Sequence, residues 1–145
     1  MRFWDSSAIV PLLVREVSSG AMGAAYQRDP EVLVWWATHV ECVSALTRLE
    51  RAGSLAGRSM SAALRRLDEL ARSWQEIQPI GQVRLNATRL LRVHPLRAGD
   101  ALQLGAALAA AENHPETLPF LTLDDRLAVA AEKEGFPIDG PSARA

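Results

Sequence analysis

The stretch Val32-Leu33-Val34-Trp35-Trp36 is aliphatic or aromatic at every position. A strand with one solvent-facing side alternates apolar and polar residues, whereas an unbroken apolar run is typical of a strand buried on both faces of a parallel sheet. The stretch therefore predicts an interior strand. Helices must cover both faces of such a sheet, and the rest of the chain has to supply them.

Strands and helices alternate on either side of this stretch. Phe3-Trp4 and residues 119–123 are apolar runs that predict two more strands, and residues 136–138 predict a short last one. Helical spacing predicts helices over residues 8–14, with Ser6 or Ser7 as the cap, and over 18–27, 38–52, 59–78, 82–92, 98–112 and 125–134. The alternation predicts an α/β fold with a mainly parallel central sheet. We expect one domain over residues 1–140 and a frayed tail at residues 141–145.

The composition is that of a globular domain, with 145 residues of which 48% are hydrophobic and 23% charged. Cys42 is the only cysteine, which excludes an intrachain disulfide and a cysteine-rich zinc site and favours a reducing, cytoplasmic setting. No apolar stretch reaches the ~18 residues of a membrane helix, so we expect a soluble protein. A Gly-rich dinucleotide fingerprint is missing, which argues against a Rossmann oxidoreductase.

The net charge of −1 conceals an uneven distribution along the chain. Residues 47–98 contain ten arginines and four acids, which gives +6, while the remainder contains six basic and thirteen acidic residues, which gives −7. Two interpretations stay open for the basic part: a solvated helical face, or a surface that binds a polyanion. Under the second interpretation Arg65 and Arg66 are candidates for contacts with nucleic-acid phosphates.

Four acids stand next to expected strand ends or helix starts, where open α/β sheets bind ligands. Asp5 and Asp124 follow apolar strands, and Glu41 and Asp100 lie in the first turn of expected helices. Converging carboxylates repel one another unless a divalent cation neutralises them. Oxygen ligands favour Mg²⁺ or Mn²⁺ over zinc. The pattern therefore predicts metal-assisted phosphoryl transfer.

Three of the acids also have a purely structural interpretation. Asp5 and Asp124 suit helix N-caps, and Thr38-His39-Val40-Glu41 has the pattern of a capping box. Asp100 is harder to explain as a cap because it leads an apolar helix. The three histidines share no spacing or common partner, and we predict surface or loop positions for them: His39, His94 and His114.

The chain resembles the PIN-domain nucleases in four motifs that occur in the family's order. These are Phe3-Trp4-Asp5-Ser6-Ser7, Glu41, Arg97-Ala98-Gly99-Asp100-Ala101-Leu102-Gln103 and Leu121-Thr122-Leu123-Asp124-Asp125-Arg126-Leu127. The likeness spans about residues 2–138. Size and pattern are most similar to VapC-type toxins, the ribonuclease members of prokaryotic type II toxin–antitoxin pairs.

The resemblance implies a PIN-like three-layer fold and a Mg²⁺- or Mn²⁺-dependent endoribonuclease. It also implies an RNA substrate, a cognate antitoxin and a homodimer. The metal-binding and catalytic acids that it implies are Asp5, Glu41, Asp100 and Asp124, with Ser6 and Thr122 as supporting hydroxyls.

Two neighbouring residues are further candidates for a supporting role. Asp125 stands next to Asp124 and can contribute to the same site, and Arg97 lies about one helical turn before Asp100 and is expected to orient its carboxylate. The alternative to an enzyme is a catalytically silent PIN-like module that only binds RNA or a protein.

Overall fold

A computed structural model describes residues 1–139, and the tail expected at residues 141–145 lies outside the described residues. Over this span, five parallel strands form one sheet in the order β3-β2-β1-β4-β5. The strands are β1 Arg2–Trp4, β2 Val32–Trp35, β3 Gln75–Ile77, β4 Phe120–Leu121 and β5 Ile138–Asp139. The helices are α1 Ser6–Leu13, α2 Ser19–Arg28, α3 Thr38–Arg51, α4 Arg58–Ser73, α5 Gly81–Val93, α6 Ala98–Ala110 and α7 Asp125–Lys133, with a 3₁₀ turn at Pro115–Thr117.

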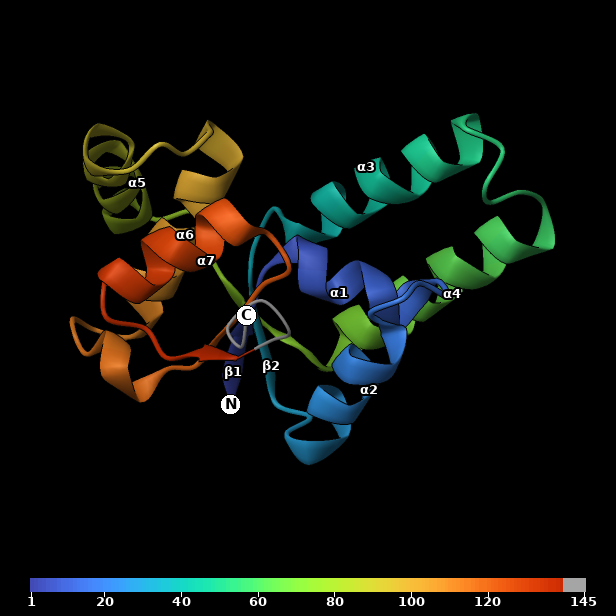
Figure 1. The fold of residues 1–145 in the computed structure, drawn as a ribbon, viewed down its shortest axis with the longest axis horizontal. Coiled ribbons are helices and arrows are strands. Elements are labelled where there is room, and N and C mark those ends of the chain that lie inside the picture. Colours follow the sequence, from blue (N-terminus) through green and yellow to red (C-terminus); the bar gives the residue numbers. More distant parts are fainter. Residues whose placement is uncertain (140–145) are drawn as a thin grey trace.

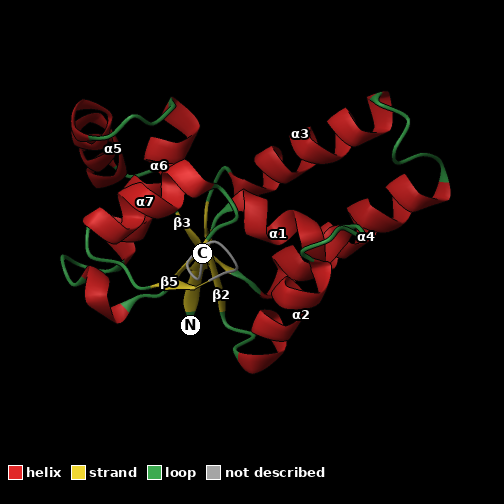
Figure 2. Cartoon of the chain, in the orientation of Figure 1, coloured by secondary structure: helices red, strands yellow, loops and turns green. Residues whose placement is uncertain are grey.

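Helices cover both faces of the sheet, as Figures 1 and 2 show. Consecutive residues of a strand point to opposite faces. Phe3 accordingly lies in a core shared with α5, α6 and α7, whereas Trp4 lies in a second core shared with α1 to α4. Phe3 stacks on Phe120 of β4, with the two ring centroids 5.3 Å apart. The predicted α/β fold with a parallel sheet is confirmed.

The apolar stretch at residues 32–36 becomes β2, which pairs with β1 on one side and β3 on the other. All four residues of β2 are buried, as expected of an interior strand. Trp36 stands in the turn after the strand, where its amide still donates to the Ile77 carbonyl of β3 while its side chain is 50% exposed.

The helix predicted over residues 59–78 is wrong at its end. Helix α4 stops at Ser73, and Trp74 takes an extended conformation. The next three residues form β3, whose register pairs Leu33 with Gln75. This strand lies at the edge of the sheet and carries polar side chains, so it has no apolar run that would have identified it.

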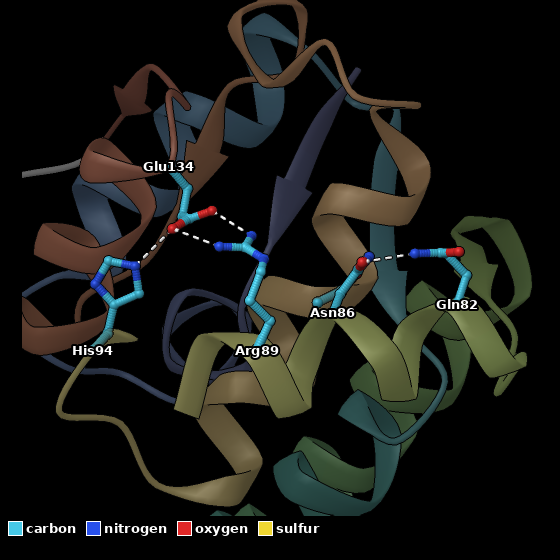
Figure 3. Close-up of polar contacts among 6 residues, drawn as sticks. Gln82, Asn86, Arg89, His94 and Glu134 are labelled. Carbon is cyan, nitrogen blue, oxygen red and sulfur yellow. Dashed lines mark hydrogen bonds and ion pairs between the residues drawn. The ribbon is translucent and has the colours of Figure 1, made fainter. Parts of the chain in front are cut away.

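Helices α5 and α6 pack closely because Gly105 has no side chain. A Cβ at this position would lie 3.0 Å from the carbonyl oxygen of Val83 and 3.1 Å from the amide nitrogen of Ala87. Asn86 Nδ2 donates a hydrogen bond of 3.0 Å to the Gly105 carbonyl, and Gln82 Nε2 donates one of 2.8 Å to Asn86 Oδ1. Figure 3 shows this pair of amides along α5.

Glu134, directly after α7, joins that helix to α5 and to the loop after it (Figure 3). Its Oε2 lies 2.7 Å from His94 Nε2, and its Oε1 lies 2.6 Å from Arg89 Nη2. His94 lies in the loop that follows α5, as predicted, but its side chain is buried, with 8% exposed. Burial raises the pKa of Glu134, but the hydrogen bonds and charges of Arg89 and His94 outweigh that effect and lower it overall.

Candidate active site

The four acids singled out in the sequence belong to the carboxyl-terminal edge of the sheet. The chain runs from β1 outward to β2 and β3, then crosses back to β4 and β5 on the other side of β1. Such a reversal of strand order leaves a crevice between the two neighbouring strands, and open α/β sheets bind ligands there. Asp5 directly follows β1, and Asp124 caps α7 just after β4, so these two acids flank the reversal.

Asp5 is both the N-cap of α1 and the centre of a hydroxyl network. Its side chain accepts from the Ser7 amide, which makes Asp5 the cap of α1. The prediction of Ser6 or Ser7 as the cap is wrong, and the capping interpretation of Asp5 is confirmed. Its Oδ2 also accepts from Ser7 Oγ at 2.5 Å and from Thr122 Oγ1 at 2.9 Å. Ser6, the supporting hydroxyl implied by the family resemblance, reaches Asp5 Oδ1 only at 3.5 Å. Ser7 is therefore the closer serine.

Thr122 connects the two strand ends that carry Asp5 and Asp124. It is fully buried, donates to Asp5 Oδ2, and accepts from the Asp124 amide at 3.0 Å. Ser7 Oγ accepts from the Leu123 amide at 2.9 Å, which adds a second link between the same segments. Asp124 itself accepts from the amides of the first turn of α7, as predicted for a capping residue. These bonds fix the backbone positions of the two acids.

Glu41 does not form the predicted capping box. The N-cap of α3 is Ala37, whose backbone receives the Glu41 amide, and the Glu41 side chain does not return to the helix start. Its Oε1 accepts a hydrogen bond of 2.7 Å from Gln103 Nε2 on α6. The same nitrogen donates to Thr38 Oγ1 at 3.0 Å. A long-range partner replaces the local one, so the capping interpretation of Glu41 is wrong.

Burial and mutual repulsion raise the pKa values of three of these carboxyls. Burial raises the pKa of Asp5, hydrogen bonds from Ser7 and Thr122 lower it in part, and the charge of Asp100 raises it again. Burial raises the pKa of Glu41 to about 7; the Gln103 hydrogen bond opposes the rise, and the charges of Asp5 and Asp100 add to it. Keeping these carboxyls ionised at neutral pH therefore costs free energy in the folded state.

Asp100 is coupled electrostatically to each of the other three acids. It raises the pKa of Asp5 and of Glu41, and its own pKa is raised by burial and by the charge of Asp124. The backbone and side chain of Arg97 and the charge of Arg126 oppose that rise. Arg97, expected to orient Asp100, is thus placed next to it, and Arg126 is a neighbouring cation that the sequence analysis missed.

The remaining sequence candidates are exposed residues. Asp125 is exposed at the start of α7, and Arg65 is exposed on α4. Arg66 Nη1 donates a bond of 2.9 Å to the Leu13 carbonyl and so ties α4 to α1. Within residues 1–139, no hydrogen bond or ion pair joins these three residues to the four acids.

The acids suit a hard divalent cation by their chemistry. All of their donor atoms are carboxylate oxygens, and three of the carboxyls carry charge that burial and neighbours disfavour, which a cation relieves. As the side chains stand in residues 1–139, no three His, Cys, Asp or Glu residues form a ready-made ligand group. Hydrogen bonds hold Asp5 and Glu41, so binding would require the other carboxylates to move towards these two.

Cys42 lies next to Glu41 in α3 and is fully buried. Burial raises the pKa of its thiol to about 12, and the charges of Glu41 and Asp5 contribute in the same direction. The thiol is therefore protonated and unreactive while α3 is in place.

We expect the metal-free protein to lose stability as the pH rises through the titration of Glu41. The folded-state pKa of about 7 exceeds the ordinary value of 4.5, so between these values the folded state binds more protons than the unfolded state and is favoured at the lower pH. A cation held by these carboxylates would favour their ionised form, so MnCl₂ is expected to raise the melting temperature more at about pH 7.5 than at about pH 5. Melting curves with and without MnCl₂ measure both effects.

The matched variant is Glu41→Gln, which keeps the size of the side chain and removes its titration. The pH dependence of the metal-free melting temperature should flatten in this variant. A wild-type protein whose response to Mn²⁺ is the same at both pH values would contradict the expectation.

Comparison with known proteins identifies the fold and shows no closer relationship. No protein-family model matches the sequence, and no curated protein matches it. FitAcB from Neisseria gonorrhoeae is similar in structure, with a TM-score of 0.67 and 16% identity over 97% of this chain and 98% of that one. PAE2754 from Pyrobaculum aerophilum has a TM-score of 0.63 and 21% identity over 95% of this chain and 82% of that one. The protein has the PIN-like three-layer α/β fold.

The lengths and compositions of the helices also bear on whether any of them can span a membrane. None of those in residues 1–139 combines the length and the apolar character needed to cross a membrane.

Proposed function

We propose that this protein is a divalent-cation-dependent endoribonuclease. The observation that carries the proposal is the gathering of acids at the reversal of strand order. Asp5 and Asp124 follow neighbouring strands there, and Glu41 Oε2 lies beside Gly99, which directly precedes Asp100. The mutual rise in the pKa values of these carboxyls agrees with this placement. A protein that needed these residues only as helix caps would not require two further acids, from α3 and α6, beside them. Carboxylates gathered at this edge suit a cation that in turn binds a phosphate.

Asp5 and Asp100 would hold a Mg²⁺ or Mn²⁺ ion, and Glu41 and Asp124 would complete its surroundings. The bound ion would supply Lewis-acid activation of water and charge neutralisation at the phosphate. Ser7 and Thr122 keep Asp5 in a fixed orientation through their bonds to its Oδ2.

The proton of the attacking water requires an acceptor near neutral pH. Burial and neighbouring charges bring the pKa of Glu41 to about 7, which suits a general base at that pH. Asp124 is the alternative candidate for this general base. Hydrolysis by this route leaves a 5′-phosphate on one RNA product.

The biological role that we propose is that of the toxin in a toxin–antitoxin pair, acting as a homodimer in the cytoplasm and inhibited by a cognate antitoxin. The sequence resemblance to VapC-type toxins supports this part of the proposal. Arginines of residues 47–98, including Arg65 and Arg66, would contact the RNA backbone. Arg66 has a structural role as well, because it joins α4 to α1 through its bond to the Leu13 carbonyl.

An assay on purified protein and a short single-stranded RNA tests the proposal. Internal cleavage is expected with Mg²⁺ or Mn²⁺ and none with EDTA. Binding of the RNA without cleavage under all metal conditions would favour a catalytically silent module instead. End-mapping of cellular RNA shortly after induction would then identify the substrate of an active enzyme.

A further inference from the structure

Gln103 is a fully buried amide in the middle of an otherwise apolar helix. Its Nε2 donates to Glu41 Oε1 at 2.7 Å and to Thr38 Oγ1 at 3.0 Å, so one nitrogen joins α6 to two residues of α3. Its Oε1 is buried and has no hydrogen-bond partner within residues 1–139. An unpaired buried acceptor costs about 1–3 kcal/mol, so the amide is a poor choice for stability alone.

The contact leaves the two oxygens of Glu41 in different situations. Oε1 is occupied by the Gln103 amide. Oε2 lies 3.7 Å from the position that a Cβ on Gly99 would take, and Gly99 directly precedes Asp100. The bond to Gln103 thus orients the carboxylate so that its free oxygen lies beside the start of α6.

Asp100 and Gln103 are three residues apart on α6, which puts them on the same face of the helix. One rigid element therefore carries one acid directly and holds a second acid through an amide. The position of Glu41 relative to Asp100 depends on this amide, because Glu41 belongs to a different helix.

We propose that Gln103 is a positioning residue, which fixes the Glu41 carboxylate through Oε1 so that Oε2 faces Asp100 and the bound cation. This inference rests on the proposed function. Gln103 touches neither the cation nor the RNA in this role.

The experiment compares Gln103→Leu and Gln103→Met, which keep the bulk of the side chain and remove both donated bonds, with Gln103→His, whose imidazole Nε2–H reaches about as far as the Gln103 amide. Two apolar variants of different shape ensure that one packing defect does not decide the result. The control is Asn86→Ala, which removes another amide bond to α6, the one to the Gly105 carbonyl. Mn²⁺ affinity is measured by calorimetry with the metal alone, beside kcat and KM for RNA.

We expect the apolar variants to lower Mn²⁺ affinity and kcat by about 10-fold or more with KM unchanged, since groups that orient metal ligands have effects of this size. Gln103→His should recover most of both, and Asn86→Ala should lose melting temperature but keep both. Folded apolar variants with wild-type affinity and kcat would overturn the proposal, and so would losses that merely follow melting temperature across all four variants.

The two proposals fail in different ways. A wild type that binds Mn²⁺ but cleaves no RNA would overturn the proposed function, while the effect of Gln103 on Mn²⁺ affinity would still decide its positioning role. A wild type that binds no Mn²⁺ would overturn both.

Discussion

Replacing Asp100 with asparagine is expected to reduce RNA cleavage by roughly 10³-fold, which corresponds to about 4 kcal/mol of transition-state stabilisation. Asp100 is the carboxylate coupled to all three of the other acids, so its charge influences the whole group. Asparagine has nearly the same shape, and it removes the repulsion that raises the pKa of Asp5 and Glu41. The metal-free variant should therefore melt at or above the wild-type temperature at neutral pH, even though it has lost most of its activity.

This combination of lost activity and undiminished stability separates a functional acid from a structural one. Initial cleavage rates with Mn²⁺ and metal-free melting curves are measured on the same preparations. Asp68→Asn is the matched control, because Asp68 is an exposed acid on α4. An Asp100→Asn protein that keeps more than about one tenth of the wild-type rate, a difference of under ~1.4 kcal/mol, would contradict the proposed site.

Removing Glu134 should have the largest effect on stability among the polar residues. Glu134→Ala leaves the buried His94 side chain and one end of Arg89 without their acceptor, and breaking such a pair from one side costs about 3 kcal/mol. The pKa of Glu134 is lowered in the folded state, so its contribution is present above the ordinary pKa of 4.5 and is lost as the pH falls further. The difference in the free energy of unfolding between wild type and variant should therefore shrink as the pH falls below that value.

Urea unfolding followed by circular dichroism measures this difference at about pH 7 and about pH 3.5. Glu132→Ala serves as the control, because Glu132 is an exposed acid in the last turn of α7, two residues before Glu134. Equal losses in the two variants, or a loss that grows in acid, would show that the network of Glu134 does not stabilise the fold.

The sequence predicts the layers of this fold well because apolar runs report burial directly. Residues 32–36 identify an interior strand, and the alternation with helices leads to a parallel sheet. Strand β3 escapes prediction because an edge strand can be polar, and its pairing with β2 is a long-range contact that no local pattern encodes. For the same reason α4 is predicted to continue past Ser73.

Candidate acids can be selected from sequence because strand ends are recognisable and parallel strands all end at one edge. The hydrogen-bond partners of these acids cannot be selected in the same way. Ser7 and Ser6 are indistinguishable by residue type, and only the turn of α1 decides that Ser7 reaches Asp5. In the sequence Gln103 is a single polar residue within an apolar helix. Its role depends on the packing of α6 against α3. His94 is likewise buried by a contact 40 residues away in the chain.

The buried thiol of Cys42 makes the helix that carries Glu41 observable in solution. A thiol-specific reagent reacts with it only when α3 separates from its neighbours, so the labelling rate reports the fraction of molecules in which that helix is open. Because this is the only cysteine in the chain, no second site contributes to the signal. The native protein thus contains a kinetic reporter of local opening, and slower labelling in the presence of a ligand would measure how strongly the ligand holds this helix closed.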